Sequence, residues 1–364
     1  MKLQMSYTNP APNAAHQAPM RLGRIFRRKD RMSFVTRTLA AAFLALPLAT
    51  QANANCDAGE TKVVMSIVTA LQGHPKGETA LALADRVNSQ MNGRMCMEVY
   101  GNSELYNDID VFQAMLDGKV QMAAPSLSRF SAYTQKLQMF DLPFLFDDPI
   151  HAMDFLATDA AKSLKNEVRP AGFVGMGFWT NGMRQISATR PLRKPADVAG
   201  LTFRVQPSDI LEAQFRLLGA DPKRLAFSKV YDALASGEVQ GQQNTWSNIY
   251  TKDFHTVQSG VTESNHSYLG YLVVMPQAFL DSLNPTDREE FIGLFELTTH
   301  EYNRFAFETN QLRRQDILDE EVMVVRLTDE EKQAWRDAFA PLYDQFSGVI
   351  GQDLIDAARN AKQK

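Results

Sequence analysis

The chain has 364 residues, of which 45% are hydrophobic and 22% charged, a balance that excludes disordered, collagen-like and coiled-coil proteins. The formal net charge of −4 is unevenly spread, because residues 1–54 hold eight lysines and arginines and one acid, leaving 30 basic and 41 acidic residues elsewhere. An acidic body of this kind argues against nucleic-acid binding, which requires a basic surface.

The basic N-terminal segment is predicted to be an export signal. Arg31 and Arg37 precede an apolar run over 38–49, and residues 52–54 (Ala-Asn-Ala) form a small-x-small cleavage site. The apolar run is shorter than the ~20 residues that span a bilayer, although a short membrane anchor is the alternative. We expect cleavage near Ala54 and a mature periplasmic protein without stable membrane insertion.

The mature chain contains two cysteines, Cys56 and Cys96. An even number of cysteines in an oxidising compartment favours a disulfide. Cys56 precedes a predicted strand over 63–68 and Cys96 opens another over 96–100, so neighbouring strands would bring the two together. Two free thiols are the alternative, and a catalytic thiol is disfavoured because no histidine-rich segment flanks either cysteine.

The body alternates apolar strands with amphipathic helices. Strands are predicted over 63–68, 96–100, 120–124, 173–179, 201–205, 239–242 and 268–275. Helices are predicted over 76–91, 108–116, 208–218 and 230–235, and a glycine follows each at or near its end. This alternation indicates parallel or mixed α/β sheets.

A weak internal repeat occurs within this alternation. Phe112–Gln121 matches Tyr231–Gln240, and in each copy a helix end is followed by a glycine and a strand. A match this short also arises by chance, but at roughly 150 residues per domain the chain length likewise indicates two lobes. Ligands of open α/β sheets bind beyond the carboxyl ends of the strands, so two facing lobes would form a cleft that closes about a hinge.

The C-terminal third is predicted to be largely helical. Thr286 and Glu289 have the spacing of a capping box, and the helical pattern then continues to about Glu320. A helix of this length far exceeds the average of about 11 residues, so we expect it to cross both lobes. A strand over 322–327 and a helix with a Thr328–Glu331 capping box follow.

The chain lacks the sequence signatures of catalysis and of metal binding. It contains no HExxH, no GxSxG elbow and no Walker A loop. The five histidines beyond the leader are scattered without metal-ligand spacing. We therefore predict a binding protein with no cofactor and no metal, and not an enzyme.

Two arginines beside predicted strands are candidate ligand contacts. Arg204 lies in the otherwise apolar strand Leu201–Val205, where a buried charge is costly unless it is paired. It is either a guanidinium that grips a ligand carboxylate bidentately or half of a structural ion pair. Arg184 follows the strand that ends at Trp179 and is either a second contact or a solvated turn residue.

A set of specific motifs extends over nearly the whole mature chain. They are Gly73–Gly77, Ala124–Phe130, Asp141–Phe146, Asn181–Gln185, Pro191–Gln206, Leu218–Pro222, Ala226–Leu234, Gln240–Asn244 and Asn265–His266. Together they resemble the solute-binding proteins of TRAP (tripartite ATP-independent periplasmic) transporters, of the C4-dicarboxylate-binding DctP type.

The resemblance implies an α/β, two-lobe periplasmic binding protein fold with a ligand cleft between the lobes and a long C-terminal helix spanning both. Lobe I would comprise residues 55–181 and about 270–309, and lobe II residues 182–269 and about 310–364. The implied function is to capture a small carboxylate and deliver it to the small and large permease subunits in the membrane. We expect the protein to be a monomer.

The resemblance also assigns roles to individual residues. Arg204 is expected to make a bidentate salt bridge to the ligand carboxylate. Arg184 and Asn244 occupy positions that add hydrogen bonds to ligand oxygens. Ser126 falls on a first-lobe loop where the far end of the ligand would lie.

Three further residues are expected around the cleft. Phe227 matches a cleft-wall position of the family, and His74 and Trp246 are predicted cleft neighbours. Burial in a hydrophobic core is the alternative for Phe227 and Trp246.

The sequence departs from the family pattern at three positions. Gln240 and Gln243 stand where the family usually has Asp and Glu, and Lys229 stands where it usually has Glu. Fewer acids near an anion site would favour a second carboxylate, whereas drift at positions that only brace the loop is the alternative. We expect a C4-dicarboxylate such as succinate, fumarate or malate. The alternative ligands are a uronate or a keto acid. The alternative function is that of a sensory module that presents its ligand to a receptor.

Overall fold

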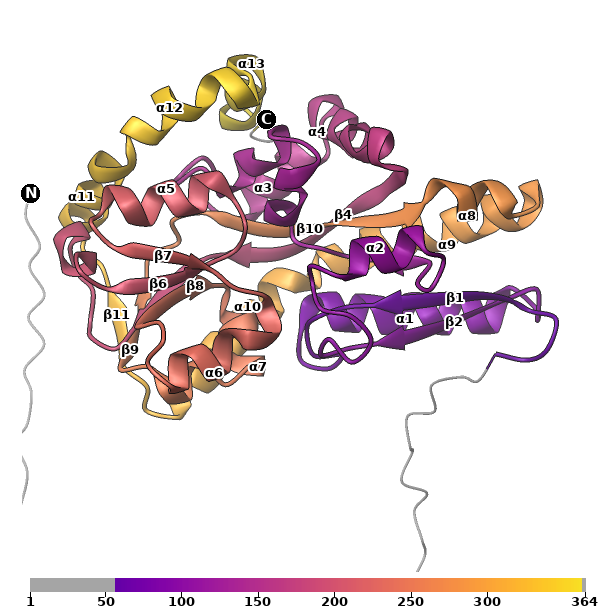
Figure 1. Ribbon diagram of the computed structural model, residues 1–364, viewed down its shortest axis with the longest axis horizontal. Coiled ribbons are helices and arrows are strands. Elements are labelled where there is room, and N and C mark those ends of the chain that lie inside the picture. The colour runs from indigo at the N-terminus through magenta and orange to yellow at the C-terminus, as the bar shows by residue number, and fades with distance from the viewer. Residues whose placement is uncertain (1–55, 362–364) are drawn as a thin grey trace, which may run out of the picture. The chain divides into compact units, whose positions relative to one another are not determined.

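Residues 56–361, which the computed structural model describes, form two mixed β-sheets. Sheet A has the strand order β2 (Met95–Tyr100), β1 (Thr61–Ser66), β3 (Met122–Ala123), β10 (Tyr268–Pro276) and β4 (Phe173–Met183). Sheet B has the order β11 (Val324–Arg326), β9 (Gly260–Glu263), β5 (Gln185–Ala188), β8 (Gly241–Asn244), β6 (Thr202–Val205) and β7 (Asp221–Arg224). Each sheet combines parallel and antiparallel pairs, and Figure 1 shows the antiparallel strands β4 and β10 side by side.

Helices follow most of the strands (Figure 1). Those of the first half are α1 (Pro75–Gln90), α2 (Val111–Leu116), α3 (Pro149–Leu156), α4 (Asp159–Leu164), α5 (Asp209–Leu217) and α6 (Val230–Ala235). The second half contains α7 (Trp246–Thr251), α8 (Gln277–Ser282), α9 (Pro285–Asn303), α10 (Phe305–Asp319), α11 (Asp329–Phe339), α12 (Pro341–Ile350) and α13 (Gln352–Arg359). Among the described residues no helix is both long and apolar enough to cross a membrane. The predicted leader and its cleavage site near Ala54 lie outside these residues.

Of the two predicted capping boxes in the C-terminal third, one is wrong and the other is confirmed. The capping box at Thr286 is wrong, because α9 begins at Pro285 and its N-cap is Asn284, two residues earlier, whose side chain accepts a hydrogen bond of 2.9 Å from the Asp287 amide. An asparagine before a proline starts a helix as well as a threonine does, so Asn284 and Pro285 define the helix start in place of Thr286. The capping box of Thr328 and Glu331 is confirmed at α11.

The internal repeat is a structural repeat with one copy in each sheet. Gly118 and Gly237 both adopt the left-handed conformation, with φ of 73° and 76°. Two residues later, Val120 and Val239 each donate a backbone hydrogen bond to the alanine four residues before the glycine. The first copy leads into β3 of sheet A and the second into β8 of sheet B.

Within the described residues the chain passes from one sheet to the other in three segments, and the first two of these are adjacent. Arg184 is the single residue between β4 of sheet A, which ends at Met183, and β5 of sheet B, which begins at Gln185. The return segment from β9 to β10 lies beside it, and the Arg184 amide donates to the Ser267 carbonyl at 2.8 Å. Arg184 is therefore held at the junction of the sheets.

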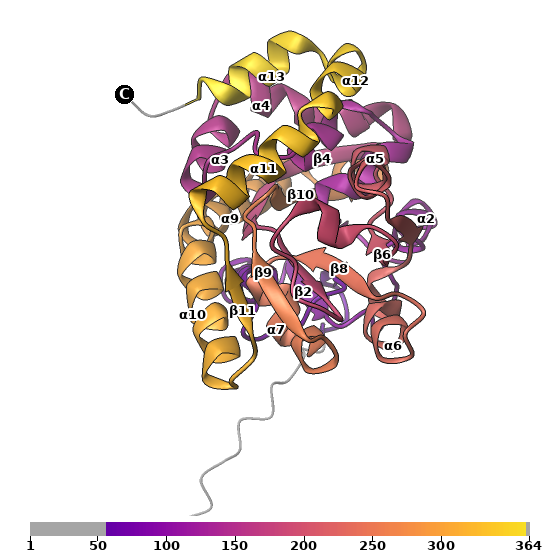
Figure 2. The ribbon, with the colours of Figure 1, turned by 90° about the vertical axis from the view of Figure 1, so that its left-hand side faces the viewer.

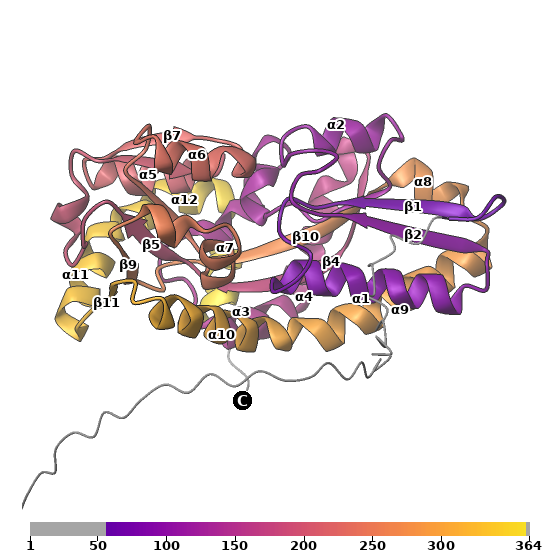
Figure 3. The same ribbon diagram turned by 90° about the horizontal axis from the view of Figure 1, so that it is seen from below.

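The long C-terminal helix is present as α9 and α10. They are separated by Arg304, whose φ and ψ of −69° and −32° are helical, and Figure 3 shows the two helices end to end. Thr299 of α9 accepts a hydrogen bond of 2.9 Å from the Trp179 indole of sheet A. Arg314 of α10 binds Glu263 of sheet B at 2.6 Å. The helical segment therefore spans both sheets, as predicted.

The hydrophobic core is continuous across the predicted lobe boundary. Phe140 of predicted lobe I and Phe215 of predicted lobe II belong to one buried cluster, which also contains Trp335 of α11. In Figure 2 the C-terminal helices follow one another over this region, where α11 contacts α5 and α13 contacts α3. The residue limits of the two lobes stay a prediction.

Candidate functional site

A cavity lies where strand ends of the two sheets meet. Ser66 ends β1, Ala123 ends β3 and Gln206 follows β6, so the cavity is at carboxyl strand ends, as expected for an α/β binding site. Its empty space is about 460 Å³, a volume that includes open solvent at its mouth. Its polar lining includes Lys76, Asp108, Ser126, Gln206, Asn248 and Tyr271.

Arg204 is buried beside this cavity with no acidic partner. Its Nε and Nη2 donate to the Leu225 carbonyl at 3.2 and 2.9 Å, and no ion pair to it forms within residues 56–361. The alternative of a structural ion pair is therefore wrong for the described residues. Burial lowers the pKa of the Arg204 guanidinium to about 9. The guanidinium lies 5.8 Å from the ring centroid of Phe227, which lines the cavity.

Arg184 is a buried ion-pair partner and not a solvated turn residue. Its Nη2 lies 2.9 Å from Asp141 Oδ1 and donates to Ser128 Oγ at 3.1 Å. Its Nη1 donates to Gln243 Oε1 at 3.3 Å. Protein groups thus occupy both terminal nitrogens, and Arg184 does not line the cavity. Its contact with the ligand stays a prediction.

Asn244 lies in a buried chain of hydrogen bonds that begins at His74. His74 Nδ1 accepts the Lys76 amide as the N-cap of α1, so Nε2 carries the proton and donates to Asn248 Oδ1 at 2.7 Å. The Asn248 amide donates to Asn244 Oδ1 at 2.5 Å, and Asn244 donates to Gln242 at 3.1 Å. Burial, reinforced by Lys76, lowers the pKa of His74 to about 3, so the imidazole is neutral. Both predicted residues thus support the cavity residue Asn248.

The remaining predicted residues separate into two groups. Ser126 and Phe227 line the cavity, where Ser126 Oγ accepts the Gln206 amide at 2.9 Å and the Phe227 backbone donates to Asp108 Oδ1 at 3.1 Å. Trp246 does not join them, because it lines a separate pocket beside α10. Both aromatic residues also belong to one hydrophobic cluster, so the core alternative holds for Trp246 and is compatible with the cleft role of Phe227.

Lys76 lines the cavity and belongs to the Gly73–Gly77 motif, but it was not among the ligand-binding residues expected from the sequence. It occupies the first turn of α1, directly after Pro75, and its side chain is 1% exposed. The sequence does carry a signal, since a lysine is unfavourable at the positive end of a helix dipole. That signal becomes meaningful only when burial is known.

Of the three positions that depart from the family pattern, Gln243 is in contact with an arginine, Arg184. Gln240 braces the starts of the neighbouring strands β8 and β6, where its side chain accepts a hydrogen bond of 2.7 Å from the Thr202 amide, and Lys229 is exposed at the start of α6. Gln243 contacts Arg184 and lies 3.2 Å from His266. Gln240 therefore fits the alternative in which the changed residue only braces the loop. Gln243 is neutral, so the acid that contacts Arg184 is Asp141.

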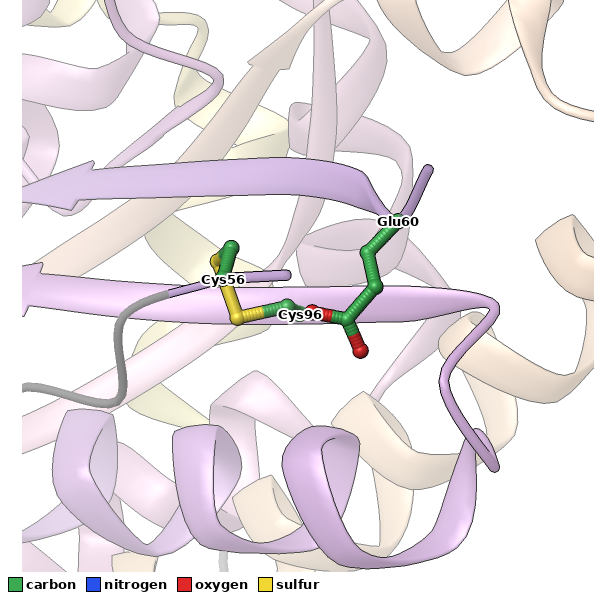
Figure 4. A group of neighbouring side chains, drawn as sticks. All are labelled: Cys56, Glu60 and Cys96. Carbon is green, nitrogen blue, oxygen red and sulfur yellow. A yellow bond between two sulfur atoms is a disulfide. The ribbon is translucent and has the colours of Figure 1, made fainter. Parts of the chain in front are cut away.

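Cys56, Glu60 and Cys96 form a group with the composition of a metal site (Figure 4). The two sulfurs are joined in a disulfide, with the Cα atoms 5.5 Å apart, which is the pairing expected from the sequence. A disulfide offers no thiolate, the form of cysteine that binds metals. The group therefore anchors the start of the described chain to β2.

The profile of the family described as bacterial extracellular solute-binding protein, family 7, matches residues 66–348. The chain belongs to this family. A C4-dicarboxylate-binding periplasmic protein DctP of Vibrio cholerae is 45% identical over 332 residues, covering 91% of this chain and 100% of that protein. The DctP protein of Shewanella loihica is 41% identical over 309 residues, covering 84% of this chain and 91% of that protein. The resemblance to TRAP solute-binding proteins is confirmed, and the family is one of binding proteins, not enzymes.

Solved structures of relatives have the same fold as this family-7 protein. A TRAP periplasmic solute-binding protein of Shewanella oneidensis with bound succinate has a TM-score of 0.82 and 39% identity, covering 84% of this chain and 100% of that one. A Pseudomonas aeruginosa protein with bound L-malate has a TM-score of 0.77 and 39% identity, covering 78% and 99%. The predicted two-lobe α/β binding-protein fold is confirmed.

Proposed function

We propose that this protein is the periplasmic binding subunit of a TRAP transporter and captures a C4-dicarboxylate such as succinate, fumarate or malate. Support comes from relatives that are 45% and 41% identical and named for C4-dicarboxylate binding. The two structural relatives at 39% identity hold succinate and L-malate, both small C4-dicarboxylates.

The observation that carries the proposal is the buried guanidinium of Arg204, which forms no ion pair with an acid in the described part of the chain. A guanidinium has five N–H donors, and the contacts of Arg204 to Leu225 use two of its three nitrogens. A buried charge without a partner is strongly unfavourable, which a ligand carboxylate would relieve by a bidentate, charge-assisted pair. Arg204 is therefore the anchor of the proposed site.

Other charges around the cavity also favour a dianion. Asp108 is the acid in the lining formed by the described residues, and Arg129 donates a hydrogen bond of 2.7 Å to it, so its negative charge is already paired. Lys76 lines the cavity, and Lys252 lies 5.8 Å from the Phe227 ring centroid. With Arg204, these lysines give the site an excess of positive charge.

The proposal includes export and a membrane partner. Residues 1–54 direct the chain to the periplasm and are removed near Ala54. The loaded protein delivers its ligand to the small and large permease subunits.

The test is a thermal-shift and calorimetric titration of the mature protein against C4-dicarboxylates, uronates and keto acids. Ligand at 100 times its Kd should stabilise the protein by about 2.7 kcal/mol. For a protein of this size that corresponds to a rise in Tm of roughly 5–10 °C. Arg204→Ala and the bulk-preserving Arg204→Met should abolish the rise, whereas Arg216→Ala, which removes an exposed arginine, should retain it.

Three results would contradict the proposal. A rise in Tm with uronates or keto acids alone would show that the ligand is not a C4-dicarboxylate. An undiminished rise in Tm in both Arg204 variants would show that Arg204 does not anchor the ligand. The absence of a rise with any acid would reject carboxylate binding altogether.

A further inference from the structure

Lys76 places a cation in the lining of the cavity itself, whereas Arg204 lies beside the cavity, next to Phe227. Its Nζ donates to the Ala124 carbonyl at 3.1 Å and lies 4.0 Å from the ring centroid of Tyr271. Both of these residues line the cavity, as Lys76 does. The ammonium therefore faces the space in which a ligand would lie.

This position is unfavourable for a lysine in the ligand-free protein. The side chain is buried, and it lies in the first turn of the 16-residue helix α1, where the helix dipole repels a cation. Within residues 56–361 no acid forms an ion pair with it. Asp108 is the acid whose charge acts on it, and that carboxylate is already bound by Arg129 and by the Phe227 amide. Burial, the largest effect, lowers the pKa of Lys76 to about 7.

The fold holds Lys76 in place even though burial and the helix dipole make this position unfavourable for a cation. His74 caps α1, and the helix start is pressed against the preceding loop at Gly77. A Cβ added to Gly77 would lie 2.1 Å from the Ala70 carbonyl oxygen and 2.3 Å from that of Leu71, so only glycine permits this approach. A buried cation that is rigidly held without a counter-ion is typical of a site that receives an anion.

We propose that Lys76 binds the second carboxylate of the ligand and makes the site selective for dianions over monocarboxylates. The inference rests on the proposed function, because it presupposes that Arg204 holds the first carboxylate. An ammonium has three N–H donors, and the Ala124 carbonyl takes one, so two remain for a ligand carboxylate. The N-terminus of α1 adds its favourable dipole to the same anion.

The two cations belong to different sheets. Arg204 lies on β6 of sheet B beside Phe227, and Lys76 lies against Tyr271 on β10 of sheet A. A ligand with a carboxylate at each end would engage one cation from each sheet. A monocarboxylate would engage Arg204 alone and leave Lys76 buried without a counter-ion, a strongly unfavourable arrangement.

The experiment compares succinate with butyrate, which has the same chain length and one carboxylate. Calorimetric Kd values are measured for the mature wild-type protein, for Lys76→Met and for Lys119→Met, which makes the same change at an exposed lysine. Lys76→Met should weaken succinate binding by roughly 100-fold, the size of a charge-assisted hydrogen-bonded pair. Butyrate affinity should stay within about threefold, and Lys119→Met should resemble wild type for both acids.

Misfolding is separable from loss of the subsite. Removing an unfavourably buried charge should leave the Tm of ligand-free Lys76→Met at or above that of wild type. Succinate affinity within threefold of wild type, or an equal loss for succinate and butyrate, would overturn the role of Lys76 while leaving the proposed function intact. Failure of the wild-type protein to bind any dicarboxylate would overturn both.

Discussion

The ammonium nitrogen of Lys76 lies 4.0 Å from the ring centroid of Tyr271, joining the first turn of α1 to the interior strand β10 of sheet A. A cation–π contact of this kind partly offsets the loss of hydration of the ammonium. Because the ring carries no net charge, the positive charge of Lys76 remains available to a ligand. Ligand binding should therefore depend on whether Lys76 is protonated.

Succinate binding should take up a proton at alkaline pH. The pKa of Lys76 is about 7 in the ligand-free protein, because burial and Lys252 lower it more than Asp108 raises it, while the adjacent His74 is neutral. Below pH 7 the ammonium is already charged, whereas above pH 7 the dianion must bind with a proton. The Kd should therefore weaken by up to about tenfold per pH unit above 7.

The measurement is calorimetry at pH 6 and pH 8.5 in buffers of different ionisation enthalpy. Proton uptake should approach one per succinate at pH 8.5 and be near zero at pH 6. In Lys76→Met both the uptake and the pH dependence should disappear. Buffer-independent heats in the wild-type protein at pH 8.5 would contradict a neutral Lys76.

Removing Asp141 should destabilise the protein through Arg184. The two side chains are buried and 2.9 Å apart, so Asp141→Asn leaves the guanidinium charge uncompensated. Breaking one side of a buried ion pair typically lowers the free energy of unfolding by about 3–5 kcal/mol. Urea denaturation measures this, with Asp159→Asn as the matched control, because the exposed pair of Asp159 with Lys162 should contribute less than about 1 kcal/mol. Equal effects of the two variants would contradict a buried, charged pair.

Acid should destabilise the protein through its buried neutral histidines. Burial, reinforced by Arg184, lowers the pKa of His266 to about 3, as burial does for His74. The unfolded chain, with histidine pKa values near 6.5, binds more protons between pH 6.5 and 3. This stability is therefore complete above pH 6.5 and is lost as pH falls, by about 1.4 kcal/mol per pH unit for each histidine.

Replacing His266 should flatten that pH dependence. Between pH 7 and 5, the free energy of unfolding of His266→Gln should fall by about 2 kcal/mol less than that of wild type. The exposed His300 provides the control, and His300→Gln should follow the wild-type curve. Parallel curves for His266→Gln and wild type would mean that His266 titrates alike in the folded and unfolded chains.

The disulfide should stabilise the fold without affecting the site. Cys56 and Cys96 are 40 residues apart and neither lines the cavity. On the chain-entropy model a closed loop of this size contributes about 4 kcal/mol. The Cys56→Ser/Cys96→Ser variant should lose up to this amount in urea denaturation and keep its succinate Kd within threefold. A loss below about 1 kcal/mol would show that the N-terminal segment lies outside the cooperative unit.

Much of the architecture follows from local sequence pattern. The apolar spacing and the glycines after helices predict α1, α5, α6, β1, β2 and β10 to within a few residues. The short strands β5, β7 and β9 escape prediction, because their four-residue segments include polar side chains and gain strand geometry from their neighbours in sheet B. Local propensity is a weak signal for such strands.

The sequence by itself determined the family, the α/β fold class and Arg204 as a candidate anchor, because motifs, apolar periodicity and a charge within an apolar strand are local signals. It favoured the Cys56–Cys96 disulfide but left two free thiols as an alternative. Only the tertiary structure decided which charges are already compensated. It pairs Arg184 with Asp141, leaves Arg204 without an acidic partner among residues 56–361 and brings Lys76 into the cavity. The physical reason is that the energy of a charge depends on its burial and on partners distant in the chain, and neither is encoded in neighbouring residues.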